Sequence, residues 1–232
     1  MSGNTTFNRR TLLRAASLGA AGALVSACTT FNPVPHVSEL PPEVGEDAGL
    51  FDPAVMYASM EDGGRVLPAI PYQKIDPRFY RQMVADPTGE VPGTVVVNPD
   101  ERFLYVVQND GQAIRYGVGV GRQGFAWSGR GVIQWKQKWP KWTPPDDMIA
   151  RQPELAKYSA ANGGMAPGLK NPLGARALYI FQNGVDTLYR LHGSPEWWSI
   201  GKAVSSGCIR LINQDVIDLY NRVSVKSPIL VV

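Results

Sequence analysis

The sequence predicts a mainly β fold, a β-sandwich or partly open barrel with a short helix near the C-terminus. From residue 91 onward, short runs rich in β-branched and aromatic residues alternate with turn residues, which is typical of a β-meander. Only one later segment, following Asn213, has apolar residues at helical spacing over several turns. A chain of 232 residues with 44% hydrophobic residues can bury one sizeable core, so we expect one main domain over residues 91–232.

The strands of this domain are expected where β-branched and aromatic residues cluster between turns. They are 94–97, 103–107, 113–120, 177–181, 187–192, a strand near Ile209, and 229–232. Asn109-Asp110-Gly111 predicts a hairpin turn. The section 122–174, rich in Gly, Trp and Pro, is expected to be mostly loop apart from a helix near 153–160. A helix capped by Asn213 precedes the last strand.

Residues 1–27 have the pattern of an export signal. Arg9, Arg10 and Arg14 precede an uncharged stretch, 15–27, that is too short to span a membrane. The adjacent arginines resemble a twin-arginine signal, although Asn8 stands where Ser or Thr is usual. We therefore expect export, with the twin-arginine route as one possible path.

Cys28 follows Val25-Ser26-Ala27, which resembles a bacterial lipoprotein box. Such a cysteine becomes the lipidated N-terminus, and its acyl chains anchor the protein stably to a membrane. The alternative is an ordinary signal whose cleavage falls near a cysteine. Lipidation at Cys28 would place the protein in the periplasm, tethered to a membrane.

Residues 28–90 are expected to form a Pro-rich tether and an N-terminal extension. The tether, 29–49, contains Pro33, Pro35, Pro41 and Pro42. Within the extension, Asp76 followed by Pro77 predicts a short helix running to Met83. We expect this extension to pack onto the domain that follows.

The charge balance gives no sign of nucleic-acid binding. The formal net charge is +3, but without the three arginines of the export signal the 23 basic residues fall to 20, which equals the 20 acidic residues. Nucleic-acid binding needs many phosphate contacts from Lys and Arg. A nearly neutral chain without a basic stripe argues against that class of partner.

Cysteine usage points to a reactive thiol. The chain has two cysteines, and lipidation would consume Cys28, which leaves Cys208 unpaired in an oxidising compartment. A thiol needs a neighbouring imidazole to act as a nucleophile at neutral pH. His192, sixteen residues before Cys208, is the candidate base, because the other histidine, His36, lies in the tether. The alternative is a buried, inert cysteine.

Small residues around the thiol fit such a site. Gly207 allows a tight turn, and the amides of Gly207 and Cys208 are candidates to face an oxyanion. The base needs an orienting partner, for which Ser205 or a backbone carbonyl near Gly193 or Ser205 is available. One Cys and one His are too few for a structural zinc site, and no cofactor is expected.

The pattern His192-Gly193 followed by Ser205-Ser206-Gly207-Cys208-Ile209-Arg210 resembles the L,D-transpeptidase catalytic domain of the YkuD type. The resemblance extends over about 140 residues. It includes 93–97, 102–106, 118–122, Trp142-Thr143-Pro144-Pro145 with Met148, Asn171-Pro172-Leu173-Gly174, 199–201 and the Cys208 motif. There are two departures: Ser206 stands where His is common, and Ala126-Trp127-Ser128-Gly129 replaces a Thr-Pro-x-Gly element.

The resemblance implies a cysteine acyltransferase of the cell wall. Cys208 would attack a peptidoglycan tetrapeptide stem and release D-Ala, and an amine on a neighbouring stem or on a lipoprotein would accept the acyl group. It also implies substrate contacts from Arg210, Gly193, Ser206 and Trp142, although Arg210 is equally well a structural ion pair. The alternatives are an L,D-carboxypeptidase, which hydrolyses the stem, and a non-catalytic wall-binding lipoprotein.

Overall fold

The computed structural model describes residues 51–121, 127–205 and 207–232, all of which belong to one compact unit. The strands are β1 (Met60–Asp62), β2 (Arg65–Leu67), β3 (Gln82–Ala85), β4 (Val95–Asn98), β5 (Phe103–Val107), β6 (Gln112–Gly117), β7 (Val120–Gly121), β8 (Gly129–Lys138), β9 (Arg176–Gln182), β10 (Val185–Ser194), β11 (Ala203–Ser205), β12 (Ile209–Ile212) and β13 (Pro228–Val231). The helices are α1 (Pro53–Met56), α2 (Asp146–Arg151) and α3 (Asn213–Arg222), with 3₁₀ turns η2 (Tyr72–Lys74), η3 (Pro77–Phe79), η4 (Pro153–Tyr158) and η5 (Trp197–Ser199).

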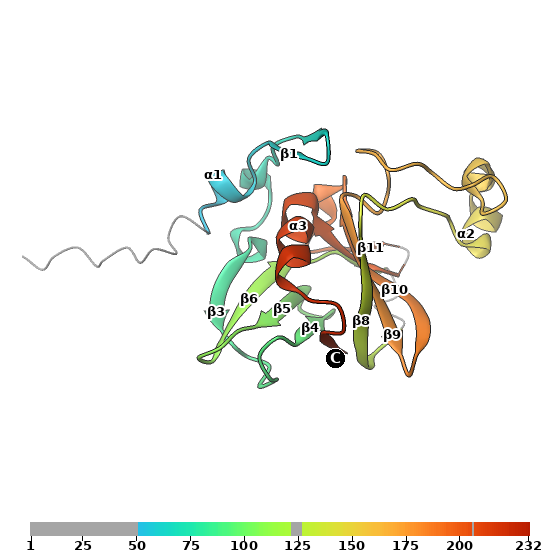
Figure 1. Cartoon of the computed structure of the whole chain (residues 1–232). Coiled ribbons are helices and arrows are strands. Elements are labelled where there is room, and N and C mark those ends of the chain that lie inside the picture. Colours follow the sequence, from blue (N-terminus) through green and yellow to red (C-terminus); the bar gives the residue numbers. More distant parts are fainter. Residues whose placement is uncertain (1–50, 122–126, 206) are drawn as a thin grey trace, which may run out of the picture. The chain divides into compact units, whose positions relative to one another are not determined.

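Nine strands form the main sheet, which confirms the mainly β prediction. Their order is β12-β10-β9-β8-β13-β4-β5-β6-β3 (Figure 1). Most neighbours are antiparallel, but β10 and β12 are parallel, as are β4 and β13. The hairpin between β5 and β6 turns at Asp110 and Gly111, whose φ angles of 60° and 69° are those of a type I′ turn.

The sheet curls so that the chain just after β6, the neighbour of the end strand β3, meets β12 at the other end, as in a partly open barrel. Gly119, just after β6, forms an antiparallel bridge with Arg210 of β12, at the other end of the strand order. The Gly119 amide donates to the Arg210 carbonyl at 2.9 Å, and the Arg210 amide donates back at 2.8 Å. A Cβ on Gly119 would lie 2.7 Å from the Ser199 carbonyl oxygen, so glycine permits this close approach.

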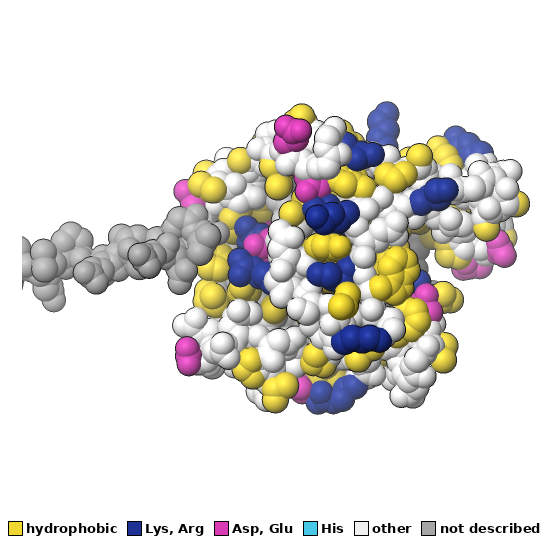
Figure 2. Space-filling view, in the orientation of Figure 1, with side chains coloured by type: hydrophobic (Ala, Val, Ile, Leu, Met, Phe, Trp, Pro, Cys, Tyr) yellow, Lys and Arg dark blue, Asp and Glu magenta, His cyan; other side chains and the backbone are white. Residues whose placement is uncertain are grey.

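The core lies between the curled sheet and α3. It joins residues of both halves of the sheet, such as Leu104 and Ile114 on one side and Leu178 and Leu191 on the other, and α3 adds Val216. Burial of such side chains stabilises the fold by roughly 1.5–3 kcal/mol each. On the α3 side, Lys and Arg side chains lie among hydrophobic ones, and no described histidine is visible on this surface (Figure 2).

Residues 51–90 pack on the domain and add a strand to its sheet. β3 pairs with β6 in an antiparallel register that runs from Gln82 opposite Arg115 to Ala85 opposite Gln112. Asp62 binds both terminal nitrogens of Arg176 on β9, at 2.7 and 2.8 Å. The main sheet is therefore completed by a strand that precedes residue 91.

Three local expectations were wrong. The helix expected from Asp76 to Met83 ends at Phe79 as a 3₁₀ turn, because the following residues extend into β3. The loop expected over 122–174 contains the ten-residue strand β8. Asn213 does not cap α3; its Oδ1 accepts a hydrogen bond from the Ala175 amide at 2.9 Å. The turn near 153–160 is present as η4, also as a 3₁₀ helix.

A buried carboxylate ties the N-terminal extension to α3. Asp215 is fully buried; the Tyr57 hydroxyl donates to its Oδ2 at 3.2 Å, and Arg81 Nη1 lies 3.6 Å from its Oδ1. Arg81 also pairs with Asp218 at 3.3 Å. Burial raises the pKa of Asp215 from 3.8 to about 7, because the desolvation cost of its charged form exceeds the attraction of Arg81.

The pH dependence of stability follows from this raised pKa. Between pH 4 and 7 the unfolded chain releases the Asp215 proton while the folded chain keeps it, so this group lowers stability as the pH rises. We predict that Asp215→Asn gains stability relative to the natural chain as the pH rises from 4 to 8, by a few kcal/mol. Urea denaturation of both proteins across this range measures the difference.

Asp218→Asn is the matched control, because Asp218 also contacts Arg81 but has a lowered pKa. Although burial opposes ionisation of Asp218, the hydrogen bond from Arg222 and the charge of Arg81 outweigh it. Loss of the Asp218 negative charge should therefore destabilise the protein by an amount that is constant between pH 5 and 8. An Asp215→Asn difference that does not change with pH would contradict the prediction.

Candidate active site

His192 lies on β10, and Cys208 lies immediately before the adjacent strand β12. His192 is in β10 and pairs with Arg210 of β12 in a parallel register, and Leu191 pairs with Ile209. Cys208 immediately precedes β12, which places it level with Arg190 by the same register. Since side chains alternate along strands, Cys208, Arg210, Arg190 and His192 share the face opposite the core residue Leu191. Figure 1 labels β10 in the same part of the sheet as β8 and β9.

The His192 ring is held in one orientation by backbone carbonyls. Its Nδ1 lies 2.6 Å from the Gly193 carbonyl oxygen, which only accepts hydrogen bonds, so Nδ1 carries the proton. Nε2 is then the basic nitrogen of the neutral ring. Of the orienting groups that the sequence offered, the Gly193 carbonyl is the one that contacts this ring.

Burial keeps His192 neutral. The residue is only 5% exposed, and burial lowers its pKa from 6.5 to about 4. The positive charges of Arg210 and Arg190 lower this pKa further, while hydrogen bonds to the Gly193 and Pro172 carbonyls oppose the shift. At neutral pH the ring is therefore a proton acceptor, not a cation.

Cys208 is partly exposed, and its thiol is protonated in this arrangement. Its Sγ lies 4.0 Å from the Leu188 carbonyl oxygen, which accepts from the thiol. Burial raises the pKa of the Cys208 thiol, while the Arg190 amide and the charges of Arg190 and Arg210 act in the opposite direction. Among the hydrogen bonds of the described residues, none joins the thiol to the His192 ring, so direct proton transfer requires the two groups to approach each other.

A bulge in β10 shapes the wall next to the thiol. Pairing of β10 with β9 shifts register between Asp186 and Arg190, and Leu188 has a φ of 64° and is 75% exposed. Asp186 Oδ1 accepts from the Leu188 amide at 2.8 Å, and the Asp186 carboxylate binds both terminal nitrogens of Arg190. Simple alternation would have kept Leu188 on the face of Arg190, but the bulge turns its carbonyl toward Cys208.

The turn before Cys208 is closed by Ser205. Its hydroxyl donates to the Cys208 carbonyl at 2.8 Å and accepts from the Gly207 amide at 3.3 Å. Gly207 has a φ of 136°, a conformation that other residues rarely adopt. The Gly207 amide is thus engaged within the turn, so an oxyanion role for this amide requires that bond to open.

Arg210 and Gly193 have structural partners. Arg210 Nη1 lies 2.6 Å from Glu196 Oε2, and Glu196 is about half exposed. A Cβ on Gly193 would overlap Asn213 Oδ1 and lie 2.9 Å from Val216, so only glycine fits there. Substrate contacts of Arg210 and Gly193 stay predictions, because an ion pair and tight packing already account for both residues.

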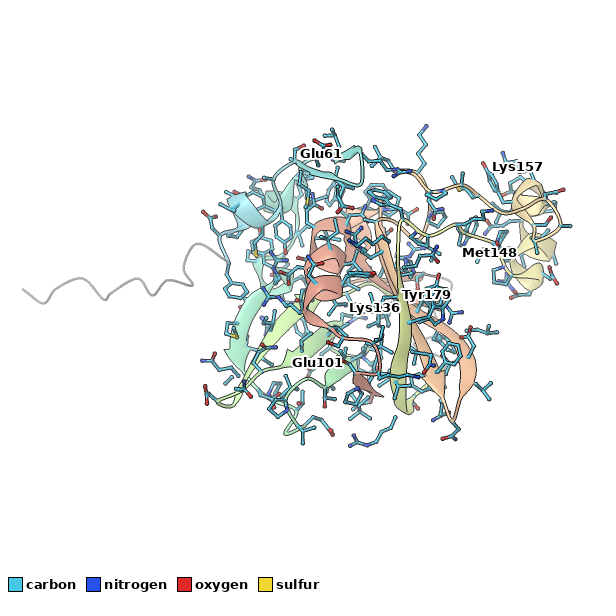
Figure 3. The ribbon with its side chains drawn as sticks, viewed as in Figure 1. Glu61, Glu101, Lys136, Met148, Lys157 and Tyr179 are labelled. Atoms are coloured by element: carbon cyan, nitrogen blue, oxygen red, sulfur yellow. The ribbon has the colours of Figure 1, made fainter. Side chains whose placement is uncertain are left out.

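Trp142 lies in an excursion of the chain between β8 and β9. Its backbone bridges Met165, and its ring contacts Tyr158 at 6.4 Å between centroids. Met148 and Lys157, on α2 and η4 of the same excursion, extend away from the sheet, whereas Lys136 and Tyr179 lie within it (Figure 3). A substrate contact from Trp142 also stays a prediction.

Some predicted features lie outside the described residues. They are Ser206, Ala126 of the element 126–129, Cys28 and the export signal 1–27. Within the described ranges, no group of three or more His, Cys, Asp and Glu side chains is placed to hold a metal ion. The helices of these ranges include none with both the length and the apolar character that crossing a membrane requires.

Arg190, Glu196 and Leu188 were missed by the sequence reasoning. In a regular strand, residues four apart share a face but lie roughly 13 Å apart, so the spacing alone does not indicate an Asp186–Arg190 ion pair. The bulge between these two residues brings them together. The Leu188 carbonyl carries no side-chain signal at all.

The structure is a mainly β domain with one histidine and one cysteine near each other on the sheet. An imidazole base beside a thiol nucleophile is the arrangement that acyl transfer requires. Residues 92–231 match the family model of the L,D-transpeptidase catalytic domain, YkuD, and the chain belongs to this family. The prediction made from the His192 and Cys208 motifs is confirmed at the level of the family.

Two similar proteins are named as probable L,D-transpeptidases. The probable L,D-transpeptidases ErfK/SrfK and YbiS of Escherichia coli strain K12 are each 32% identical to this chain, over 142 and 145 residues. These matches cover 60% and 59% of this chain and 43% of each relative, so the chain matches less than half the length of these relatives.

One crystal structure, described as a probable carnitine operon oxidoreductase CaiA from Brucella melitensis, is 45% identical. It covers 66% of this chain and 94% of its own, with a TM-score of 0.47. A likeness of this extent carries no argument about the activity of the present chain.

We predict that the His192 ring remains neutral until the pH falls to about 4, because burial opposes its charge. NMR titration of protein labelled at histidine, with His36→Gln to assign the two rings, measures the midpoint. Because the unfolded chain binds this proton near pH 6.5, His192 should also lower stability as the pH falls from 6.5 to 4. A His192 midpoint above pH 6 would show that the ring is not desolvated.

Proposed function

We propose that the protein is a peptidoglycan L,D-transpeptidase with Cys208 as nucleophile and His192 as base. The observation that carries this proposal is that His192 lies on β10 and Cys208 directly before its parallel neighbour β12, within a segment that matches the L,D-transpeptidase family. The parts of the chain outside this segment contribute no argument about substrate.

The proposed reaction has two halves. Nε2 of His192 takes the proton of the Cys208 thiol as sulfur attacks the carbonyl carbon before the terminal D-residue of a tetrapeptide stem. The imidazolium then gives this proton to the departing amine, and D-Ala leaves a thioester on Cys208. An acceptor amine loses a proton to His192, attacks the thioester and restores the thiol.

A neutral His192 supports a base of this kind. A ring with a pKa of about 4 does not form a resting ion pair with a thiolate, and burial of the thiol likewise favours its neutral form. The proton therefore moves during attack, as in a serine–histidine pair. The Nδ1 hydrogen bond to the Gly193 carbonyl keeps Nε2 available for this step.

The acyl acceptor decides between transpeptidation and the alternatives. An amine of a neighbouring stem gives a 3-3 crosslink, an amine of a lipoprotein gives protein attachment, and water gives carboxypeptidase activity. No cofactor enters any of these routes.

We predict that Cys208→Ala abolishes acylation by a disaccharide-tetrapeptide and by a carbapenem, because the variant lacks the sulfur on which the thioester would form. His192→Ala should slow acylation by about 10²–10⁴-fold, the usual contribution of a general base. Intact-mass spectrometry of the protein after incubation with each compound detects the adduct, and peptide mapping assigns it.

An adduct on Cys208 followed by crosslinked dimer supports transpeptidation, and an adduct that resolves only to tripeptide supports the carboxypeptidase. No adduct with either compound, from folded protein with a titratable thiol, would favour a wall-binding lipoprotein. Wild-type turnover by Cys208→Ala would exclude the proposed mechanism.

We further propose that the protein is exported and held at a membrane in the periplasm through lipidated Cys28. Cys28→Ser should move the protein from the membrane fraction to the soluble fraction of cells, because no acyl chain can then be attached. Cys208→Ser is the matched control and should leave the protein in the membrane fraction. Equal partition of the natural chain and Cys28→Ser would contradict lipidation.

A further inference from the structure

The β1–β2 hairpin lies outside both the main sheet and the segment that matches the family model. Its two strands form a sheet of their own, which is seen above α3 in Figure 1. The family match begins at residue 92, after the hairpin. No step of the reaction proposed above uses the hairpin, so its contacts are additional to the domain that the family defines.

The hairpin holds Trp139, the first residue after β8. The Asp62 carboxylate accepts from Trp139 Nε1 at 2.7 Å, and the Arg65 guanidinium lies 4.7 Å from the centre of the indole ring. A Cβ on Gly63 would lie 2.8 Å from Nε1, so glycine allows the turn to approach the indole this closely. Leu67 packs with Trp139 in one buried cluster. The hairpin thus encloses the side chain at which the chain leaves β8.

The same carboxylate holds the start of β9. Asp62 accepts from both terminal nitrogens of Arg176, at 2.7 and 2.8 Å, and the Arg176 side chain is buried. Arg176 Nη1 also donates to the Ala175 carbonyl at 2.8 Å, and the Trp139 amide donates to that carbonyl at 2.8 Å. A bidentate contact of this kind fixes orientation as well as distance. Asp62 therefore joins the end of β8 to the start of β9 in a closed network of hydrogen bonds.

The start of β9 is the immediate neighbour of the His192 backbone. Ala177 pairs with His192 across the sheet, and a Cβ on Gly193 would lie 3.2 Å from the Ala175 amide nitrogen. That amide donates to Asn213 Oδ1, against which Gly193 is packed. The Gly193 carbonyl oxygen lies 2.6 Å from His192 Nδ1. A displacement at Ala175 would therefore reach the carbonyl that orients the imidazole.

We propose, as a step that rests on the proposed function, that Asp62 is a positioning residue for His192. It acts through Arg176 and Ala175, which hold the backbone against which Gly193 packs. Both carboxylate oxygens are needed, because they accept from three N–H groups, two of Arg176 and one of the indole. Asp62 touches neither the substrate nor the transferred proton.

The tautomer of the His192 ring tests the proposal without a substrate. In protein labelled at histidine, the chemical shifts of the ring nitrogens at pH 7 distinguish a proton on Nδ1 from a proton on Nε2. The natural chain should show His192 protonated on Nδ1. In Asp62→Asn, one oxygen replaces two and the network opens, so the two nitrogen shifts should move toward each other as the second tautomer appears. His36→Gln, introduced into both proteins, assigns the rings.

The rate of acylation gives a second readout. Reaction of Cys208 with increasing concentrations of a carbapenem, followed by intact-mass spectrometry, yields a limiting rate constant and a half-saturating concentration. Asp62→Asn should lower the limiting rate constant by about 10–100-fold, because a small displacement of the base slows proton transfer. The half-saturating concentration should change by less than about twofold, because Asp62 does not contact the ligand.

Glu90→Gln is the matched control. Glu90 also belongs to the N-terminal extension and binds both terminal nitrogens of an arginine, Arg130, near the opposite end of β8. Its side chain is 18% exposed, compared with 17% for Asp62. This variant loses a carboxylate of the same kind away from His192, so it should leave the ring shifts and the limiting rate constant unchanged.

Unchanged His192 shifts in folded Asp62→Asn, or shifts that Glu90→Gln changes equally, would overturn the proposal. A lower thermal midpoint without a change in the ring would show that the ion pair is purely structural. If Asp62→Asn does not fold, Trp139→Phe decides the question, since it keeps an aromatic ring but removes the Nε1 donor and should move the shifts in the same direction. Failure of the natural protein to react with a tetrapeptide would count against the proposed function alone, because the ring shifts do not depend on activity.

Discussion

The parallel pairing of β10 with β12 is the constraint on which the candidate site depends. The two strands are separated in sequence by the segment 195–208, and only their register brings His192 and Cys208 to one face. Gly119 fixes the free edge of β12 through its bridge to Arg210, so the opposite end of the curled sheet supports the same strand. A shift of one residue in β12 would turn Cys208 toward the core.

The sequence predicted most of the strands and the reactive pair, because these carry local signals. Turn residues bounded the strands of the first meander, and the His192 and Cys208 motifs were sufficient to predict the family. β8 was missed because Gly129 and Gly131 weaken its strand pattern. A Cβ on Gly131 would lie 2.7 Å from the Phe181 carbonyl oxygen, so glycine there reflects tertiary contact, not loop character.

The remaining errors have the same origin in contacts between distant residues. Tyr80 and the residues after it are extended because β6 offers a strand edge, which outweighs the helix signal of Asp76 and Pro77. The bulge of β10 depends on Asp186, whose carboxylate satisfies the Leu188 amide. The local sequence pattern predicts neither the pairing with β6 nor the hydrogen bond between Asp186 and Leu188. Both depend on a strand edge and an unpaired amide that exist only after the sheet has formed.

The orientation of the His192 ring depends on two asparagines, Asn213 and Asn171, which carry no chemistry of their own. Asn213 holds the Ala175 amide and packs against Gly193, whose carbonyl receives the Nδ1 proton. The Asn171 side chain donates to the Pro140, Met165 and Ala166 carbonyls and accepts from the Leu173 amide. Pro172, whose carbonyl is hydrogen-bonded to the His192 ring, lies in sequence between Asn171 and Leu173. The Asn171 side chain therefore positions both the start of the segment between β8 and β9 and the Pro172 carbonyl at the imidazole. A movement of one would carry the other with it.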